Sequence, residues 1–475
     1  MSTTKDGPEA PPIRSILDTD LYKLTMQQAV LRHYPTTRVA YKFTNRSAST
    51  MKFTRPAVDL IRTHIHNLVH LQLTPQEREW LETTCPYLRS DYLDYLERFR
   101  FDPKSQVRVE FVPSTTDQDA QTWGDLSLRV EGVWSDVIFY EVPLMAIVSE
   151  VYFSIVDTNW SLEGQFDQAK AKAERLTSNG IRYSEFGTRR RRSYQTHRIV
   201  LEGLISGDSY ASSSTSSSAG NGKLLGTSNV HFAQLYNLVP IGTVAHEWTM
   251  AIAALQGYTH SNLKALQLWD SVYSPPDFIP NSPTHDLTIA LTDTFSTNVF
   301  WADLLTNPSG VEIAKRWRGL RQDSGDSKAF AQKALEAYKK IGVDPMTKVV
   351  IYSDGLDVER CLELAQYSKE IGIGAGFGVG TSFTNDFIKA NAAANGEKSR
   401  PLNIVIKLDS VEDRPVVKIS DDLTKNTGDP AEVLAVKRRF GIPTSSTTGK
   451  GVTTMGTIQG GVALESGVEI EVEDA

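Results

Sequence analysis

The sequence has little cysteine, no long uninterrupted apolar run and no excess of positive charge, and each of these shortages excludes a class of protein. The only cysteines are Cys85 and Cys361, far apart in a chain of 475 residues. They offer no disulfide framework and no cysteine-based zinc site, and they favour a reducing compartment. We therefore expect a cytoplasmic protein, and a nuclear location remains open.

A membrane segment and a secretory signal are not expected. The longest apolar stretch, residues 142–156, is interrupted by two serines and a glutamate, so we expect it to be too short and too polar to span a bilayer. Residues 1–12 are polar, acidic and proline-containing. They lack the apolar core of a signal peptide and are expected to be disordered. The sequence therefore predicts no membrane partner.

The formal net charge is −7, from 57 acidic and 50 basic residues. A general nucleic-acid binder carries a broad positive surface, so this balance argues against a nucleic-acid partner. Any anion site has to be a local gathering of positive charge. The apolar fraction of 40% in a chain of this length predicts a globular protein with two domains, or with one large domain and additions.

Two patterns divide the chain, and together they predict the α/β class. Residues 13–142 mix helical patterns with alternating strands and predict an N-terminal α/β domain, completed by strands within 403–440. Residues 143–402 alternate helices with short apolar strands, which predicts a parallel sheet with crossover helices. A closed barrel competes with an open sheet. The expected strands are 39–43, 107–112, 126–130, 181–183, 224–225, 238–241, 287–291, 349–352, 374–379, 404–407 and 416–419, and the expected helices include 169–176, 252–266, 327–341 and 358–371.

Two segments depart from these patterns. Residues 206–222 are rich in serine and glycine, so we expect a flexible insertion loop without chemistry. Residues 441–475 are rich in glycine and threonine and then acidic, and we expect a mobile tail.

His246 stands at an expected strand-to-helix junction, after the apolar run 238–241 and beside Glu247. In α/β proteins chemistry gathers where strands end, and a histidine there can act as acid, base, ligand or nucleophile. A buried histidine can equally be structural, so both interpretations stay open. Asp293 follows another apolar strand and can either orient an imidazole or cap a helix.

An arginine run, 189–192, follows Phe186 and a glycine. Guanidinium groups bind phosphate oxygens in pairs, and Phe186 can present its ring to a flat substrate. A solvated basic face or a structural ion-pair cluster is the alternative.

Acids and glycines follow three more strands. Asp323 and Asp354 each stand beside a glycine before an expected helix, where acids hold Mg²⁺, accept hydrogen bonds from ribose or simply cap the helix. Gly378 and Gly380 end a strand in a turn that can hold a phosphate, although the full dinucleotide fingerprint is missing. The chain has no Walker A lysine motif and no kinase signature. A barrel would gather all these residues at one mouth.

Five strings within this pattern resemble the nicotinate phosphoribosyltransferases, and the fungal members are most similar. The resemblance runs from about Leu17 to about Gly441, and it excludes the serine-rich loop and the tail. The matching strings are Leu17–Ala29, Glu185–Arg192, Gly226–Asn229, Gly242–Trp248 and Arg321–Gly325. The resemblance implies a type II phosphoribosyltransferase fold, an irregular α/β barrel with an α/β domain beside it. The absence of two adjacent acids before a Thr-Gly loop at 352–355 is consistent with that type.

The resemblance also implies a reaction and its partners. Nicotinate and phosphoribosyl pyrophosphate would give nicotinate mononucleotide and pyrophosphate, with Mg²⁺ as cofactor and ATP as co-substrate. His246 would be phosphorylated by ATP, with Asp293 as its hydrogen-bond partner. A homodimer with shared active sites is compatible with the resemblance, because Tyr22 comes from a neighbouring subunit in dimeric relatives.

The remaining site residues follow from the same resemblance. Phe186 and Tyr22 would stack on the two faces of the pyridine ring. Arg189 and Arg321 would contact the nicotinate and phosphate groups, and either Asp323 or Asp354 could hold magnesium. The other implied substrate-binding residues are Thr227 and Ser228, the ribose-binding Asp323, Asp354 and Gly355, and the 5′-phosphate turn of Gly378, Gly380 and Thr381.

Ser228 bears on whether the substrate is an acid or an amide. Related nicotinamide enzymes carry an aspartate at this point of the string, and an aspartate would repel a carboxylate. The neutral serine therefore favours nicotinate. Nicotinamide phosphoribosyltransferase is the second enzyme hypothesis, and a non-catalytic phosphate or nucleic-acid binder using residues 189–192 is the third.

Overall fold

The computed structural model describes residues 5–7, 9–114, 123–214, 222–274, 284–392, 396–422 and 425–444. The tail from residue 445 onward lies outside the described residues. The chain forms two compact units that interleave along the sequence, and each is described by itself. Unit 1 comprises residues 1–242, 355–365 and 376–407, and unit 2 comprises residues 243–354, 366–375 and 408–475. The domain boundaries expected at residues 142 and 402 remain a prediction.

Unit 1 contains a large antiparallel sheet, a separate antiparallel pair of β11 with β12, and a short set of parallel strands. Its strands are β1 (Arg38–Asn45), β2 (Phe53–Thr54), β3 (Val107–Pro113), β4 (Trp123–Val133), β5 (Arg182–Glu185), β6 (Lys223–Thr227), β11 (Phe387–Ile388) and β12 (Lys398–Ser399). Its helices are α1 (Leu21–His33), α2 (Arg55–Asn67), α3 (Pro75–Thr84), α4 (Ser90–Arg98), α5 (Pro103–Gln106), α6 (Trp134–Val137), α7 (Glu141–Val151), α8 (Gln165–Ser178), α9 (Tyr194–Ser214), α10 (Val230–Tyr236) and α17 (Thr381–Thr384), with short turns η1 (Leu68–His70), η3 (Ile138–Tyr140), η4 (Tyr152–Val156), η5 (Thr188–Arg190) and η8 (Ala390–Ala392).

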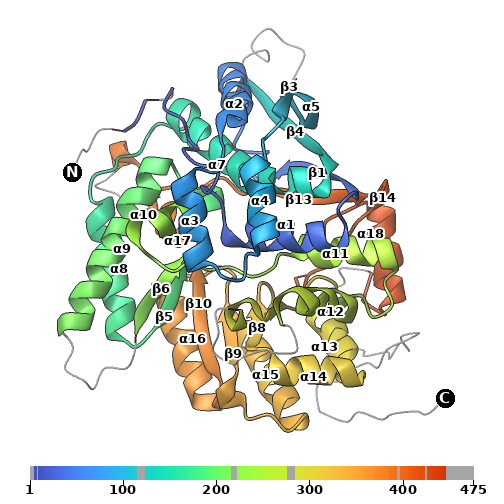
Figure 1. The fold of residues 1–475 in the computed structure, drawn as a ribbon. Coiled ribbons are helices and arrows are strands. Elements are labelled where there is room, and N and C mark those ends of the chain that lie inside the picture. The colour runs from blue at the N-terminus through green and yellow to red at the C-terminus, as the bar shows by residue number, and fades with distance from the viewer. Residues whose placement is uncertain are drawn as a thin grey trace. The chain divides into compact units, whose positions relative to one another are not determined.

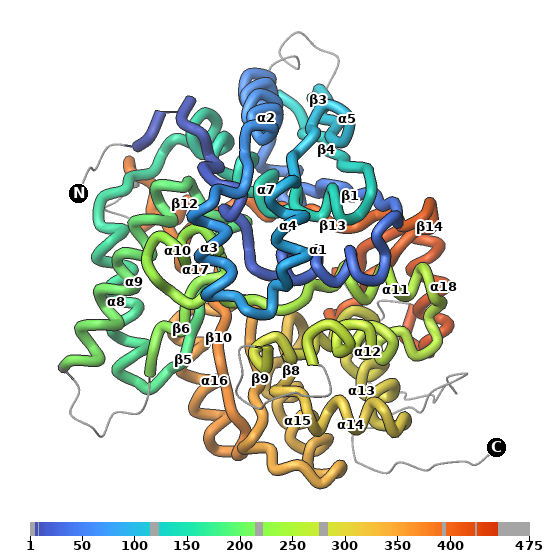
Figure 2. The backbone as a smooth tube through the Cα atoms, in the orientation of Figure 1, coloured from blue at the N-terminus to red at the C-terminus, as the bar shows by residue number. Residues whose placement is uncertain are grey.

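Unit 2 carries parallel strands with helices between them. Its elements are α11 (His246–Gln256), α12 (Ser261–Tyr273), η6 (His285–Leu287), β7 (Ile289–Leu291), α13 (Thr297–Leu305), α14 (Pro308–Arg316), β8 (Gly319–Gln322), α15 (Ser327–Lys340), η7 (Pro345–Thr347), β9 (Val349–Tyr352), β14 (Arg414–Pro415) and α18 (Pro430–Arg439). Three elements contribute residues to both units: α16 (Val358–Ile371), β10 (Gly374–Val379) and β13 (Ile404–Val411). Figure 2 follows the chain through α12, α13 and α14, which pack on one another.

The strand pairings confirm the two kinds of sheet expected from the sequence. In unit 1, β4 pairs antiparallel with both β1 and β3 (Figure 1). β13 follows β1 in the order of the same sheet. In the parallel set, β5 pairs with β6 and β10 pairs with β5. In unit 2, β8 lies between β7 and β9 and is parallel to both. The carboxyl ends of β7, β8 and β9 therefore meet at one edge.

Three expected elements are wrong. Residues 238–241 form only an isolated bridge, Thr227 with Pro240, because proline has no N–H to donate to a strand partner. Residues 416–419 likewise form a single bridge, Lys418 with Thr427. The expected helix 252–266 is two helices, since α11 ends at Gln256 and the next residue, Gly257, has a φ of 82° that leaves the helical region.

The serine-rich segment is helical over its first nine residues, so the expected loop is wrong for 206–214. Gly207, within the predicted loop, and Gly203, just before it, allow two helices to approach closely. A Cβ at Gly203 would lie 2.5 Å from the carbonyl oxygen of Phe166, and one at Gly207 would lie 2.2 Å from that of Lys170. These positions are four residues apart on the face of α9 that packs on α8. Residues 215–221 lie outside the described residues.

The apolar run near the middle of unit 1 is longer than expected. Residues Trp134–Val156 form one helical stretch long and apolar enough to cross a membrane by length and composition. However, 89% of its apolar window is buried inside the protein. A helix that is apolar all round is also typical of the core of a large protein, so the run is weak evidence for a membrane span.

Glu150, at the end of this run, gives a prediction about pH. Its carboxylate accepts a hydrogen bond from the Tyr194 N–H at 2.9 Å, and burial raises its pKa to about 7 although the Arg191 charge opposes the shift. The fold therefore favours the protonated form, and this contribution to stability is lost as pH rises toward and through 7. We expect Glu150→Gln to raise the free energy of unfolding at pH 8.5 by up to about 3 kcal/mol, and to raise the Tm with it. At pH 5 we expect no such increase.

Thermal unfolding at both pH values checks this expectation. Glu163→Gln, at an exposed position in the same unit, serves as the control and should leave the pH dependence unchanged. Equal Tm values for Glu150→Gln and the wild type at pH 8.5 would contradict the burial effect.

Candidate functional site

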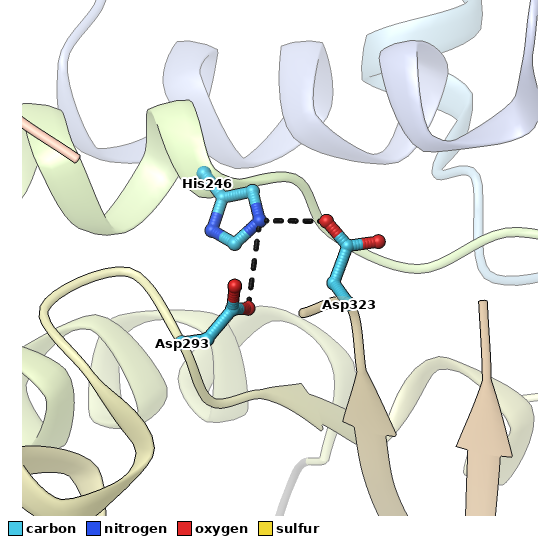
Figure 3. A group of neighbouring side chains, drawn as sticks. All are labelled: His246, Asp293 and Asp323. Atoms are coloured by element: carbon cyan, nitrogen blue, oxygen red, sulfur yellow. Dashed lines mark hydrogen bonds and ion pairs between the residues drawn. The ribbon is translucent and has the colours of Figure 1, made fainter. Parts of the chain in front are cut away.

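His246 is the first residue of α11 and lies among acids from two strands of unit 2. Its Nδ1 is 3.1 Å from the Thr294 hydroxyl, and its Nε2 is 3.1 Å from an Asp323 carboxylate oxygen. Asp293 lies slightly farther away, with Oδ1 3.6 Å from the same Nε2. Figure 3 shows both carboxylates directed toward one edge of the imidazole. The two acids predicted beside the histidine site therefore lie together with it.

The strand ends explain this arrangement. Asp293 comes two residues after β7 and Asp323 one residue after β8, so parallel pairing brings both carboxylates to one edge. Asp354 comes two residues after β9. Its carboxylate pairs with Lys425 at 3.3 Å rather than with the imidazole. The prediction that Asp293 caps a helix is wrong, because Ser296 caps α13.

Lys418 is the residue that the sequence analysis missed. Its ammonium Nζ lies 2.8 Å from His246 Nε2 and 3.2 Å from Asp293 Oδ2, and only 7% of the side chain is exposed. The one available signal was a lysine inside an apolar run, which is rare in a packed segment. The neighbours Val417 and Ile419 pack with Phe295, Val436 and other apolar residues of unit 2. That packing directs Lys418 into the cluster.

Burial, together with the positive charge of Lys418, favours the neutral imidazole. Burial and then the positive charge of Lys418 lower the pKa of His246 to about 4, although both acids act in the opposite direction. Burial would raise the pKa of Asp323, but the charges of Arg321 and Lys418 and the hydrogen bond with His246 hold it well below its usual value. Burial would raise the pKa of Asp293, but the charge of Lys418 and the hydrogen bond from Ser324 help to lower it. The site therefore presents a neutral imidazole between two carboxylates and an ammonium group.

Polar neighbours hold the two acids in place. Asp323 Oδ1 accepts hydrogen bonds from Arg321 at 2.7 Å and from the Ser353 hydroxyl at 2.9 Å. Asp293 Oδ2 accepts one from the Ser324 hydroxyl at 2.6 Å. Arg321, which was expected to bind substrate, is thus also an internal partner of Asp323.

The same group can hold a divalent cation. One ligand atom from each of His246, Asp293 and Asp323 lies within 4.8 Å of the others. Asp293 Oδ1 is buried and accepts no hydrogen bond within the described part of the chain. A buried carboxylate oxygen without a partner suits a cation, and Mg²⁺ prefers oxygen ligands. Asp323 fits the magnesium hypothesis better than Asp354, which is not part of this group.

Unit 1 carries the other expected substrate residues. Arg189, whose side chain is 40% exposed, lies 3.8 Å from Asp20 and 3.6 Å from Glu141. The ring of Tyr22 lies 5.9 Å from this guanidinium. Ser228 donates a hydrogen bond to Asp20 at 2.7 Å. These residues of one chain form a second cluster of polar side chains.

Several of these groups are already paired. Burial raises the pKa of Asp20 against the influence of Arg189, whereas the charge of Lys23, 2.5 Å away, lowers the pKa of Glu141 despite burial. Thr227 is buried and donates to Glu185 at 2.5 Å. Thr227 thus contacts a structural carboxylate, and its expected substrate contact remains a prediction.

Phe186 lies against the glycine turn. A Cβ at Gly378 would lie 3.3 Å from the Phe186 ring, and one at Gly380 would lie 3.0 Å from its carbonyl oxygen. The Phe186 N–H donates to Val379 at 2.8 Å. Unit 1 therefore brings Phe186, Gly378 and Gly380 together, with Thr381 opening α17. Gly355, expected to bind ribose, has a φ of 61° in the turn after Asp354.

The arginine run is not one phosphate site. Arg191 is buried and donates to both Asp18 oxygens at 2.8 Å. Arg192 is also buried and donates to Asn385 at 2.8 Å. The structural alternative is therefore correct for these two residues.

Comparison with known proteins assigns the family. Residues 181–444 match the nicotinate phosphoribosyltransferase (NAPRTase) family, and residues 17–149 match its N-terminal domain. A probable nicotinate phosphoribosyltransferase of Schizosaccharomyces pombe is 45% identical over 434 residues, which is 91% of this chain and 99% of the relative. The nicotinate phosphoribosyltransferase of Saccharomyces cerevisiae is 39% identical over 92% of this chain and 97% of its own.

Solved structures agree with this assignment. A structure from Saccharomyces cerevisiae matches with a TM-score of 0.82 at 38% identity, over 92% of this chain and 100% of that one. The nicotinate phosphoribosyltransferase of Porphyromonas gingivalis matches with a TM-score of 0.77 at 34% identity, over 90% of this chain and 100% of that one. These likenesses confirm the predicted type II fold. The chain belongs to the nicotinate phosphoribosyltransferase family of enzymes.

Proposed function

We propose that the protein joins nicotinate to phosphoribosyl pyrophosphate, giving nicotinate mononucleotide and pyrophosphate for NAD biosynthesis. Membership of the family supports this reaction. The observation that carries its ATP-dependent form is the half-buried His246 imidazole, which lies beside Asp293 and Asp323 and whose pKa is lowered to about 4. A neutral imidazole has the lone pair that a phosphoryl acceptor needs.

The described residues suit the electrostatic part of this reaction. Displacement at the anomeric carbon releases a pyrophosphate, whose growing charge has to be stabilised. Magnesium supplies such charge when bound, and Asp323 and Asp293 would hold it. Arg321 and Lys418 provide fixed positive charge in the same unit.

We propose that ATP phosphorylates His246 during the cycle. Nδ1 of His246 contacts the Thr294 hydroxyl, and Nε2 is the ring nitrogen that faces the acids. A phosphoryl group on that nitrogen would couple ATP hydrolysis to product formation. We also propose a cytoplasmic location and a homodimer with shared sites.

The charge balance around Arg189 favours the acid substrate. Arg189 and Lys23 carry two positive charges beside the carboxyl groups of Asp20 and Glu141. An aspartate at position 228 would add a third carboxyl group to this cluster and oppose an anionic ligand. The Ser228 hydroxyl adds none, which supports nicotinate over nicotinamide.

Initial rates with nicotinate and nicotinamide, measured in parallel with phosphoribosyl pyrophosphate, Mg²⁺ and ATP, test the proposed function. We expect kcat/KM to be about 100-fold or more higher for nicotinate, because only the acid forms a charged pair with Arg189. Ser228→Asp should lower kcat/KM for nicotinate, and Ser228→Asn, of similar size and neutral, should lower it less. Equal use of both substrates by the wild type would support the nicotinamide hypothesis instead.

The non-catalytic hypothesis has lost most of its basis. It relied on residues 189–192 as an anion-binding surface, and Arg191 and Arg192 are buried with internal partners. Salt-sensitive RNA binding without turnover would restore it.

A further inference from the structure

Three parallel strands end in one row of unit 1, and this row contains a buried acid. In the register of the pairings, Val379 of β10 lies opposite Glu185 of β5, and Glu185 lies opposite Thr227 of β6. Each of these residues is the last of its strand. The residues that directly follow β5 and β6 are Phe186 and Ser228, both of which are expected to bind the pyridine acid. The acid therefore lies next to two residues of the expected nicotinate site.

The Glu185 carboxylate binds groups from three parts of the chain. Its side chain is fully buried. Oε1 accepts a hydrogen bond from the N–H of Gly187, in the turn that carries Phe186. Oε2 accepts one from the Thr227 hydroxyl at 2.5 Å and lies 2.9 Å from Nε2 of His197, which is also buried. The carboxylate thus connects the turn after β5 to the end of β6.

The partners of Glu185 favour its ionised form. Burial would raise the pKa of this carboxyl group, but His197 and the hydrogen bonds from Thr227 and Gly187 lower it. An ionised carboxylate accepts hydrogen bonds at both oxygens, which is what two donors on different segments require.

The turn at Gly187 is tightly enclosed. A Cβ at this position would lie 2.2 Å from the Thr384 hydroxyl and 2.8 Å from Glu185 Oε1. Thr384 also donates to the Gly187 carbonyl at 3.0 Å, so hydrogen bonds hold the backbone on both sides of this glycine. At the neighbouring strand end, the Ser228 N–H donates to the Glu185 carbonyl at 2.8 Å. Glu185 therefore fixes the backbone directly after Phe186 and the backbone of Ser228.

We propose that Glu185 is a positioning residue, which holds Phe186 and Ser228 at the separation that the pyridine acid needs. It acts through the Gly187 N–H and the Thr227 hydroxyl and does not touch the substrate. The inference rests on the proposed function, because that function makes nicotinate the ligand of Phe186 and Ser228. It also assigns the Thr227 hydroxyl an indirect role, through Glu185, in place of a substrate contact.

Thr227→Val tests this link with little change of shape, because valine keeps the branched side chain and removes the hydroxyl that Glu185 accepts. We expect the KM for nicotinate to rise about 10-fold and kcat to change by less than about 2-fold, since misplaced binding residues weaken the ground state and the transition state alike. Thr227→Ser, which retains the hydroxyl, should recover most of the loss. The KM for ATP, whose proposed acceptor His246 lies in unit 2, should not change. Thr63→Val, at an exposed position of α2, is the matched control and should change none of these values.

A double-mutant cycle with Glu185→Leu separates an indirect role of Thr227 from a direct one. Leucine removes both acceptor oxygens, so Thr227→Val should add less than about 2-fold to the KM for nicotinate in that background. Effects that multiply would show that Thr227 acts on the substrate itself and would overturn its assigned role. A purely structural role of the pair would lower the Tm and the fraction of active enzyme, and hence kcat, at an unchanged KM.

Amide hydrogen exchange gives a readout that needs no turnover. In the wild type without substrates, we expect the Gly187 N–H to be protected within the peptide 186–190. In Glu185→Leu its exchange should be about 10-fold or more faster, because the N–H loses its acceptor. Unprotected Gly187 in the wild type, or an unchanged KM in folded Thr227→Val, would overturn the role of Glu185. Both tests remain if Glu185→Leu does not fold.

The proposed function fails in a different way. A wild type that forms no product from nicotinate and phosphoribosyl pyrophosphate would overturn the reaction and, with it, the purpose that we assign to the positioning. The exchange of the Gly187 N–H would still decide whether the Glu185 carboxylate holds the turn.

Discussion

His246→Ala is expected to lose all stimulation by ATP while retaining slow, ATP-independent transfer of the phosphoribosyl group. The imidazole is the group that would accept the phosphoryl, and alanine leaves no acceptor between Asp293 and Asp323. We expect the rate with ATP to fall by on the order of 100-fold or more, the scale for groups that act directly in a chemical step. Incorporation of labelled γ-phosphate into the protein should fall to background.

A second histidine of unit 2 provides the matched control. His260 pairs with Asp303 at 3.2 Å and lies outside the His246 cluster. Its φ of 52° is tolerated by asparagine, so His260→Asn should keep both ATP stimulation and phosphate incorporation. Full ATP coupling in folded His246→Ala would show that the phosphoryl acceptor has been assigned to the wrong residue.

Arg191→Met is expected to destabilise the protein strongly. Arg191 donates to both oxygens of Asp18, and neither side chain is exposed. Burial alone would raise the pKa of Asp18, but the Arg191 charge lowers it, so the variant leaves a buried carboxylate without its counter-charge. Breaking such a pair costs about 3–5 kcal/mol. We expect the Tm to fall by roughly 10 °C.

Arg189, in the same arginine run, provides the control for Arg191→Met. Arg189 is 40% exposed and lies 3.6 Å or more from its acids, so Arg189→Met should cost about 1 kcal/mol or less. Thermal unfolding of both variants in one buffer measures the difference. Similar Tm values for the two variants would contradict the structural role of Arg191. A partial recovery of Tm in Arg191→Met with Asp18→Asn would locate the cost in the orphaned carboxylate.

The sequence predicted most accurately those elements that are determined by local residue patterns. The bounds of β9 and β10 match the expected strands, because each is a short apolar or glycine-rich run between turns. Asp293 and Asp323 follow β7 and β8 as expected, and parallel pairing brings these strand ends to one edge, whereas the strand expected before His246 is absent from the described residues. Resemblance to the family then supplied the chemistry that position alone left open.

Non-local partners account for what was missed. Lys418 lies 172 residues beyond the histidine it contacts, and no local pattern reports that separation. Arg192 is hydrogen-bonded to Asn385, 193 residues away. The sequence alone therefore could not show which of the four arginines are buried and which can bind a ligand. The first half of the serine-rich segment was misread because its one glycine, Gly207, serves close helix packing rather than a turn.

The late position of Lys418 bears on how the enzyme matures during synthesis. Its segment is anchored by apolar contacts with α18, which ends at Arg439, so the histidine and its acids emerge from the ribosome well before the ammonium that completes their cluster. A polypeptide that stops before α18 would carry Lys418 and every strand of unit 2's parallel set, but not the apolar side chains of α18 that pack against Val417 and Ile419.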